Sequence, residues 1–412
     1  MELTMRVNSL VALECVSLRN LSAITALILA VNSYCARAED DSPGSIPLGN
    51  FALIPTLDVQ EGYDDNFLSL NENPQSSWLT IITPTLQLVT EKGIGAYRLT
   101  YALSNGDYAS SSADNYTDHQ LAADAIFEPN FRHRITLNST VYRGHEARGT
   151  DLTEGAAATS VSAPIEYKAF SWDTSYRYGA EEATGRLEFK IGSLERHYLN
   201  FRSTTESKDR DELKGSGAFY YKFSPKTHLV FEVRQRDINY LNDTSPTLDS
   251  TETKFLVGAD WQGTALTSGS LRVGQVRKNF DSSSREDFSG LDWEAGIAWA
   301  PKTYSVFNLT SGRTLDESTG TGDFIDAKSI GLSWHHEWME RLSSDVGYTY
   351  TKQQYAESDT RNTINTYSAG IDYQMRRWLK AGLSINHTDK SSSNESDGYK
   401  RNQYVLTMRA ML

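Results

Sequence analysis

The sequence predicts an all-β fold: a transmembrane antiparallel up-and-down β-barrel of about eighteen strands with both termini in the periplasm. Apolar and polar residues alternate in runs separated by turns and polar loops, and this rhythm continues from Phe51 to Leu412. Around the turn at 224–226, apolar side chains occupy alternate positions and charged side chains fill the positions between them. Successive side chains of a strand point to opposite faces, so one face is apolar and the other is charged. The alternating residues there are Phe219, Tyr221, Phe223, Leu229, Phe231 and Val233, with Glu232, Arg234 and Arg236 between the last three and after them.

Each alternating run is taken as one strand, and the runs give an even number, as a single-chain bacterial barrel requires. The hydrophobic fraction of 39% and the mean hydropathy of -0.50 exclude a bundle of transmembrane helices. A barrel is compatible with these values, because only alternate residues of each strand face lipid. We expect strands near residues 51–61, 77–90, 95–109, 116–128, 131–145, 164–178, 186–200, 211–223, 227–240, 252–262, 269–280, 288–300, 303–315, 325–338, 342–355, 363–375, 378–390 and 399–412.

The connections alternate in length, which predicts the topology of the barrel. Short turns of outer-membrane barrels face the periplasm and long loops face outside, so this chain should start and end on the periplasmic side. The short connections are 91–93, 128–130, 224–226, 301–302, 339–341 and 376–377, and the long ones include 64–77, 145–163, 202–211, 242–251 and 314–323.

Aromatic residues cluster beside the short turns, where they predict an aromatic girdle at the periplasmic interface. The apolar face of the runs is expected to contact outer-membrane lipid, and the charged face to line the lumen. Interior charges are costly unless the interior is wet, so the sequence predicts a pore. The expected girdle is Phe127, Phe131, Tyr221, Phe223, Trp261, Trp299, Tyr304, Trp338, Tyr373 and Trp378. The inward set includes Arg98, Arg134, Glu188, Lys190, Glu232, Arg234, Arg236, Lys254, Asp260, Arg272, Asp292, Glu294, Asp372, Lys380 and Arg409.

The N-terminal segment differs in composition and predicts a signal peptide over residues 1–38. An apolar stretch at 21–31 follows basic residues and precedes Ala36-Arg37-Ala38, a small-x-small cleavage pattern, so the mature chain should begin at Glu39. Residues 39–50 would form a periplasmic extension and residues 51–412 the barrel. Both cysteines, Cys15 and Cys35, lie in the leader, so neither a disulfide nor thiol chemistry is expected.

The sequence provides little support for a nucleic-acid-binding protein, an enzyme or a metal site. The 40 basic and 53 acidic residues make the chain acidic, which argues against a nucleic-acid partner. No catalytic, phosphate-binding or calcium-binding motif occurs, so we predict no enzyme and no cofactor. His335 and His336 are adjacent on a predicted strand and would point to opposite faces, so we expect them to share no metal ion.

The lumen is the candidate site, and its charges allow two interpretations. Its cations could attract acidic sugars and its tyrosines could stack on pyranose rings. Alternatively, the Arg and Glu rows could pair across neighbouring strands and only stiffen the wall. The candidate polysaccharide contacts are Arg98, Arg134, Tyr142, Tyr220, Arg234, Arg236, Lys254 and Arg272.

The first strands carry a family resemblance. Residues 51–67 read FALIPTLDVQEGYDDNF, followed by ITPTL at 82–86, YRLTY at 97–101 and GDY at 106–108. This resembles the putative β-barrel porin 2 family, whose members often begin with a Gly-Tyr-Asp-Asp-Asn type segment and occur in exopolysaccharide clusters of Gram-negative bacteria. Gly62 would permit a bend where the strand leaves the membrane, and the following polar residues suit a solvated first loop or serve structure alone. The signature residues are Gly62, Tyr63, Asp64, Asp65 and Asn66.

The resemblance implies an outer-membrane protein that gives a secreted polysaccharide its exit route without changing it chemically. Its expected partners are outer-membrane lipid, a polysaccharide or oligosaccharide, and periplasmic export machinery. A nutrient or oligosaccharide uptake porin would share every feature above, and an adhesive barrel would need loop 145–163 to bind something outside. Whether this loop folds into the pore stays open at this point.

Overall fold

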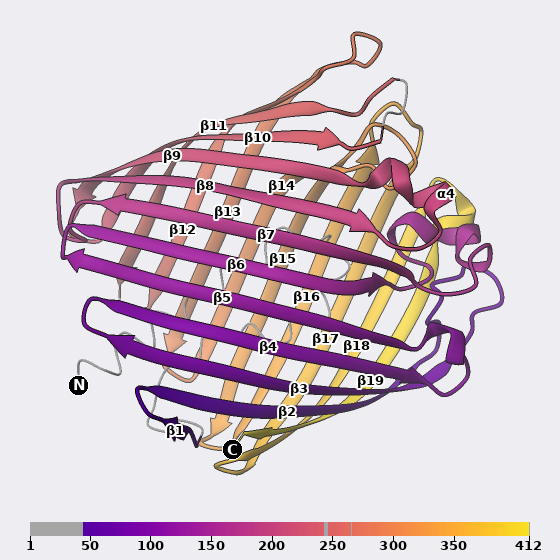
Figure 1. Ribbon diagram of the computed structural model, residues 1–412, viewed down its shortest axis with the longest axis horizontal. Coiled ribbons are helices and arrows are strands. Elements are labelled where there is room, and N and C mark those ends of the chain that lie inside the picture. Colours follow the sequence, from indigo (N-terminus) through magenta and orange to yellow (C-terminus); the bar gives the residue numbers. More distant parts are fainter. Residues whose placement is uncertain (1–43, 243–245, 265, 412) are drawn as a thin grey trace.

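The strands form one closed wall, which Figure 1 shows from the side. Strands β2 (Phe51–Asp64) to β19 (Tyr399–Met411) each pair antiparallel with their chain neighbours. The wall closes where β19 pairs with β2, from Gln403↔Asp64 to Met411↔Thr56. The computed structural model describes residues 44–242, 246–264 and 266–411. The predicted signal peptide with its cleavage site at Ala38, both cysteines and Leu412 lie outside the described residues.

The wall confirms the predicted barrel, since each predicted run coincides with one strand to within a few residues at its ends. The short strand β1 (Ile46–Leu48) was not predicted, because three residues are too few to show an alternating pattern. It pairs with the first residues of β2. No helix in the described ranges is long and apolar enough to cross a membrane. The strands are β1 (Ile46–Leu48), β2 (Phe51–Asp64), β3 (Ser77–Lys92), β4 (Gly95–Tyr108), β5 (Tyr116–Asn130), β6 (His133–Glu146), β7 (Ile165–Tyr178), β8 (Gly185–Tyr198), β9 (Arg210–Ser224), β10 (Thr227–Tyr240), β11 (Ser250–Thr264), β12 (Thr267–Phe280), β13 (Phe288–Lys302), β14 (Ser305–Glu317), β15 (Phe324–Met339), β16 (Leu342–Tyr355), β17 (Arg361–Arg376), β18 (Leu379–Ser392) and β19 (Tyr399–Met411), and the short helices are η2 (Ser112–Asp114), η3 (Asp151–Thr153), η4 (Gly155–Thr159), α4 (Arg202–Thr205), η5 (Glu206–Lys208) and η6 (Glu395–Asp397).

The two ends of the barrel differ in their connections. At the turn end, most connections are two-residue turns, such as 225–226 and 303–304. At the loop end, the connections are longer, and the longest is the β6–β7 loop, residues 147–164. Figure 1 places the short helical turns at the loop end and the C-terminus at the turn end. By the general rule for outer-membrane barrels, the turn end faces the periplasm.

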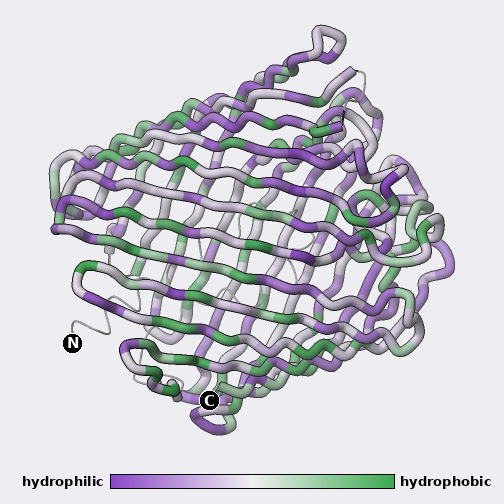
Figure 2. Tube along the Cα trace, in the orientation of Figure 1, coloured by the Kyte–Doolittle hydropathy of each residue, from purple (hydrophilic) through white to green (hydrophobic). Residues whose placement is uncertain are grey.

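The outer surface is apolar along the middle of the strands. Leu291 and Val257, for example, are 60% and 55% exposed although both are hydrophobic. Figure 2 shows the resulting alternation of hydrophobic and hydrophilic residues along each strand. At the turn end, the predicted girdle aromatics are mostly exposed, with Phe131 at 77%. Such a band, edged by aromatic side chains, is the surface that a bilayer requires.

The wall is not a single layer everywhere, because the β14–β15 hairpin folds inward at the loop end. The β13–β14 ladder begins only at Glu294↔Gly312, whereas the β14–β15 ladder continues to Glu317↔Phe324. Strands β10 and β14 are four positions apart, or about 19 Å in a flat wall. Nevertheless Arg236 on β10 donates to the Leu315 carbonyl on β14 at 2.9 Å.

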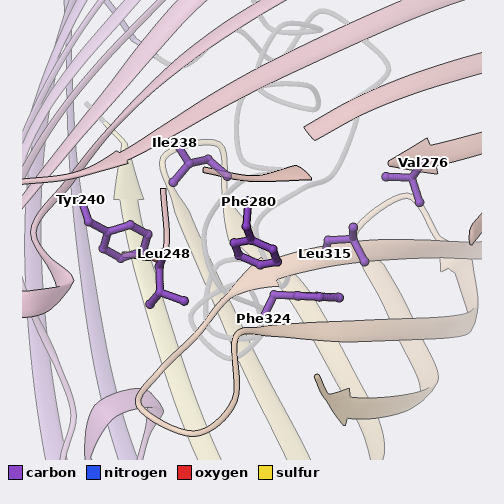
Figure 3. Close-up of a cluster of buried hydrophobic side chains, with 7 residues drawn as sticks. All are labelled: Ile238, Tyr240, Leu248, Val276, Phe280, Leu315 and Phe324. Atoms are coloured by element: carbon purple, nitrogen blue, oxygen red, sulfur yellow. The ribbon is translucent and has the colours of Figure 1, made fainter. Parts of the chain in front are cut away.

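A buried apolar cluster fills the space between the two layers. Its members come from β10, the β10–β11 connection, β12, β14 and β15, and Figure 3 shows them gathered together. The infolded hairpin therefore narrows the loop end of the lumen. The cluster is Ile238, Tyr240, Leu248, Val276, Phe280, Leu315 and Phe324.

Candidate functional site

The predicted lumenal cations lie on the inner face, and each of them is paired with a carboxylate. Arg98 pairs with Asp124 at 2.9 Å on the neighbouring strand, as the pairing interpretation expects. The other pairs are Arg134–Glu128 at 3.1 Å, Lys254–Asp292 at 3.1 Å, Arg272–Asp260 at 2.7 Å, Lys380–Asp372 at 3.2 Å and Arg409–Asp58 at 2.6 Å. The lining thus consists of ion pairs and carries both positive and negative charges.

Arg234 and Arg236 form larger networks. The Arg234 guanidinium lies between Glu232 and Glu294, each at 2.7 Å, and its side chain remains 33% exposed on the inner face. Arg236 lies within 4 Å of carboxylates on three other strands, namely Glu212 at 3.7 Å, Glu252 at 2.9 Å and Glu317 at 3.4 Å. Charges compensated this closely attract a passing polyanion less than free cations would.

The two candidate tyrosines also have partners in the wall. The Tyr142 hydroxyl donates to Asp118 at 2.9 Å, and its ring packs over Gly144, where a Cβ atom would lie 2.2 Å from it. Tyr220 is buried, and the Arg186 guanidinium lies 4.3 Å from its ring centroid. Sugar stacking on these rings remains a prediction.

The signature residues close the barrel, which agrees with the interpretation that they serve structure and not with a solvated loop. Asp64 is 3% exposed and accepts two hydrogen bonds from Arg401, at 2.9 Å and 2.5 Å. Asp65 accepts from the backbone and the side-chain amide of Asn402, both at 2.6 Å. Asn66 is buried and donates to the Lys400 carbonyl at 2.9 Å. These polar residues therefore join the first wall strand to the last.

The β6–β7 loop crosses the mouth of the barrel and reaches the far wall. Along the closed wall, β6 and β18 are separated by β2–β5 and β19, roughly 30 Å of sheet. Glu154 of this loop accepts a hydrogen bond from the Lys390 ammonium on β18. The Tyr355 hydroxyl on β16 donates to the other carboxylate oxygen at 3.4 Å. Lys390 and Tyr355 both belong to the inward-facing sets of their strands, so the loop lies within the mouth.

Further contacts hold this loop against the neighbouring loops. Arg148 pairs with Asp114 of the β4–β5 connection at 2.5 Å. Gly149 adopts φ +84° and packs so closely on Leu68 that a Cβ atom would lie 1.9 Å from the Leu68 carbonyl oxygen. Ala158 is fully buried. The question that the sequence left open is thereby answered, since residues 147–164 fold inward over the pore.

Burial disfavours the charged form of Glu154 and raises the pKa of its carboxyl above the ordinary value. The positive charge of Lys390 lowers this pKa, whereas the nearby carboxylates of Asp397 and Asp151 raise it further. The closed loop therefore holds its carboxylate at a cost that Lys390 does not fully offset.

Two groups of the described residues combine histidine with other side chains that can ligate a metal ion. His335 bonds to Asp345 at 2.8 Å, whereas the His336 ring lies 4.3 Å from that of Trp338. The two histidines take opposite faces, as predicted. At the loop end of β8 and β9, Glu195, His197 and Asp211 have ligating atoms within 4.8 Å of one another. No local motif indicates this group, because its members lie on two strands.

The chain is similar to known outer-membrane proteins in sequence family and in fold. A family described as "Putative beta-barrel porin 2" matches residues 42–412, and no curated protein sequence matches the chain. Among solved structures, the chain is similar to OpdK of Pseudomonas aeruginosa with vanillate, with a TM-score of 0.48, 12% identity, and coverage of 87% of this chain and 98% of OpdK. It is also similar to the FrpB iron transporter of Neisseria meningitidis, F3-3 variant, with a TM-score of 0.45 and 12% identity over 82% of this chain. The match spans 62% of that FrpB chain, less than two thirds of its length.

Proposed function

The chain belongs to the Putative beta-barrel porin 2 family, and from this membership we propose that it is a passive conduit for an exported exopolysaccharide. The protein is an outer-membrane β-barrel with the architecture of a porin-like channel. Movement through such a channel is driven by a gradient, so the force for export would come from synthesis at the inner membrane. The conduit would leave the polymer chemically unchanged.

The paired lining is the observation that best supports this proposal. A polymer that passes through a pore must bind well enough to enter and weakly enough to leave. Ion pairs such as Arg98–Asp124 and Arg272–Asp260 offer polar contacts without a strong net charge. Hydroxyl-rich chains can exchange hydrogen bonds along such a surface, which suits continuous sliding more than tight binding.

The loop at the mouth also suits a conduit that is not permanently open. A wide, unobstructed lumen would leak small solutes through the outer membrane. The β6–β7 loop and the infolded β14–β15 hairpin reduce this leak from the outer side, and a moving loop would admit the polymer when it arrives. In this proposal, the loop is a lid over the exit.

Deletion of the gene tests the proposed direction of transport. We expect cell-free polysaccharide to fall and periplasmic polysaccharide to rise, with both restored by expression of the wild-type chain. Uptake of small sugars is measured in the same strains. Normal secretion combined with failed growth on one sugar would overturn the export proposal in favour of an uptake porin.

A further inference from the structure

We propose that Lys390 and its neighbours form a carboxylate-binding site for an acidic polysaccharide, and that Glu154 occupies this site while the mouth is closed. The inference rests on the proposed function and names the substrate class. In it, the carboxylate of the loop stands in for a uronic acid carboxylate of the cargo. The acidic polymer would displace Glu154 and so open the lid.

The site is built into the inner wall. Lys390 is 2% exposed, and its ammonium donates to Glu154 and lies 6.0 Å from the Tyr399 ring centroid. On β16 and β17, Tyr355 and the buried Asn362 lie beside it, 3.4 Å apart between the hydroxyl oxygen and Nδ2. An ammonium and a hydroxyl donor therefore hold one carboxylate, and the Asn362 amide lies beside the hydroxyl. All but Glu154 belong to the wall and would stay when the loop leaves.

The cost of an unpaired charge gives the site its selectivity. Removing one partner of a buried ion pair leaves an uncompensated charge, which is strongly unfavourable. Opening the lid without a replacement would leave Lys390 in that state until water reached it. A carboxylate of the polymer replaces Glu154 directly, whereas a neutral sugar offers no charge. The acidic polymer thus binds the open state better, which is the condition for shifting the population toward it.

The lid is held weakly enough to be displaced. Burial and the neighbouring carboxylates of Asp397 and Asp151 raise the pKa of Glu154. Asp151 belongs to the same loop and would leave with it, whereas Asp397 stays, so a ligand at this position would lack one of the two like charges that disfavour the charged form of Glu154. A uronate that enters from the lumen meets Lys390 and Tyr355 without bringing the loop backbone into this crowded position. A carboxylate of the polymer can therefore take the position of the Glu154 carboxylate.

Single-channel recording in planar bilayers with the full-length mature protein tests this inference. Oligogalacturonate and a malto-oligosaccharide of equal length are added to the side of the turn end. We expect the acidic oligomer to raise the frequency of open events roughly tenfold, the effect of about 1.4 kcal/mol, and the neutral oligomer to have little effect. In Lys390→Met the acidic response should disappear, and in Lys390→Arg it should persist.

A matched control and a binding measurement make the result decisive. Lys400→Met removes an ammonium that is 73% exposed and should leave the response intact. Calorimetric titration of Glu154→Gln with oligogalacturonate should show binding that Glu154→Gln/Lys390→Met lacks. Equal responses to both oligomers, or an acidic response that survives in Lys390→Met, would overturn the inference. A secretion defect without any preference for acidic oligomers would refute this site but leave the conduit standing, whereas normal secretion in the deletion strain would refute the conduit alone.

Discussion

Replacing residues 150–160 of the β6–β7 loop by a short Gly-Ser linker is expected to raise single-channel conductance severalfold. The loop crosses from β6 to the inner faces of β16 and β18, so its removal widens the current path at the mouth. The Arg148–Asp114 ion pair lies outside the replaced segment and would still anchor the shortened connection. Conductance in planar bilayers, together with the exclusion limit for neutral polymers, measures the effect.

The matched control for this experiment keeps the loop in place. Among the described residues, the hydroxyls of Thr159 and Ser160 donate only to nearby loop carbonyls, at 3.0 Å and 2.7 Å. Thr159→Ala/Ser160→Ala should therefore leave the conductance at the wild-type value. If the loop replacement also left it there, the loop would not be the constriction.

Asp64→Ala is expected to destabilise the barrel by about 3–5 kcal/mol, because it leaves the Arg401 guanidinium without its carboxylate at a buried position. Asp64 accepts hydrogen bonds from Arg401 and, at 3.0 Å, from Gln403, across the closure between β2 and β19. Its loss weakens the one ladder that joins the ends of the chain. Urea unfolding in lipid vesicles, followed by tryptophan fluorescence, measures the change in the free energy of unfolding.

An exposed ion pair beside the same strand provides the control. Lys400 and Asp389 lie 3.5 Å apart, with Lys400 73% exposed, so Asp389→Ala should cost less than about 1 kcal/mol. The double variant Asp64→Ala/Arg401→Ala should recover part of the stability lost in Asp64→Ala, since no unpaired charge remains. Equal stability of Asp64→Ala and Asp389→Ala would show that the signature residues do not hold the closure.

The strands of the wall could be predicted from the sequence because the pattern that identifies each strand lies within that strand. A strand with one face in lipid and one in water must alternate with period two, and the run around Phe231, Val233 and Arg234 does so visibly. Connection length then fixes which end of each strand carries a loop. The opposite faces of His335 and His336 follow from the same period, and the structure agrees.

The contacts of the β6–β7 loop at the mouth, and the contacts that join β19 to β2, could not be predicted, because the residues that make them are distant in sequence. Asp64 and Arg401 are 337 residues apart, and Glu154 and Lys390 are 236 apart. A polar segment such as 147–164 has no period that indicates where it will pack. The inward fold of β14–β15 was missed for a related reason, since Leu315 and Phe324 alternate as wall residues do although they pack on a second layer.

For the lumenal cations, the sequence predicts where the side chains point but not which carboxylates they pair with. Their inward orientation follows from alternation, but their pairing depends on register between strands. Arg98 lies opposite Asp124, and no local pattern sets that register. The sequence could therefore place the charges in the lumen without deciding between free cations and ion pairs.

The most direct test of a polysaccharide conduit closed by the β6–β7 loop is secretion with that loop tethered. Both cysteines of the chain lie in the predicted signal peptide, so Glu154→Cys/Lys390→Cys can be joined by a cleavable bifunctional thiol reagent added outside the cells. We predict that tethering stops release of cell-free polysaccharide and that cleavage of the reagent restores it, with no effect of the reagent on either single-cysteine variant. Undiminished secretion from cells whose loop is tethered would contradict the account.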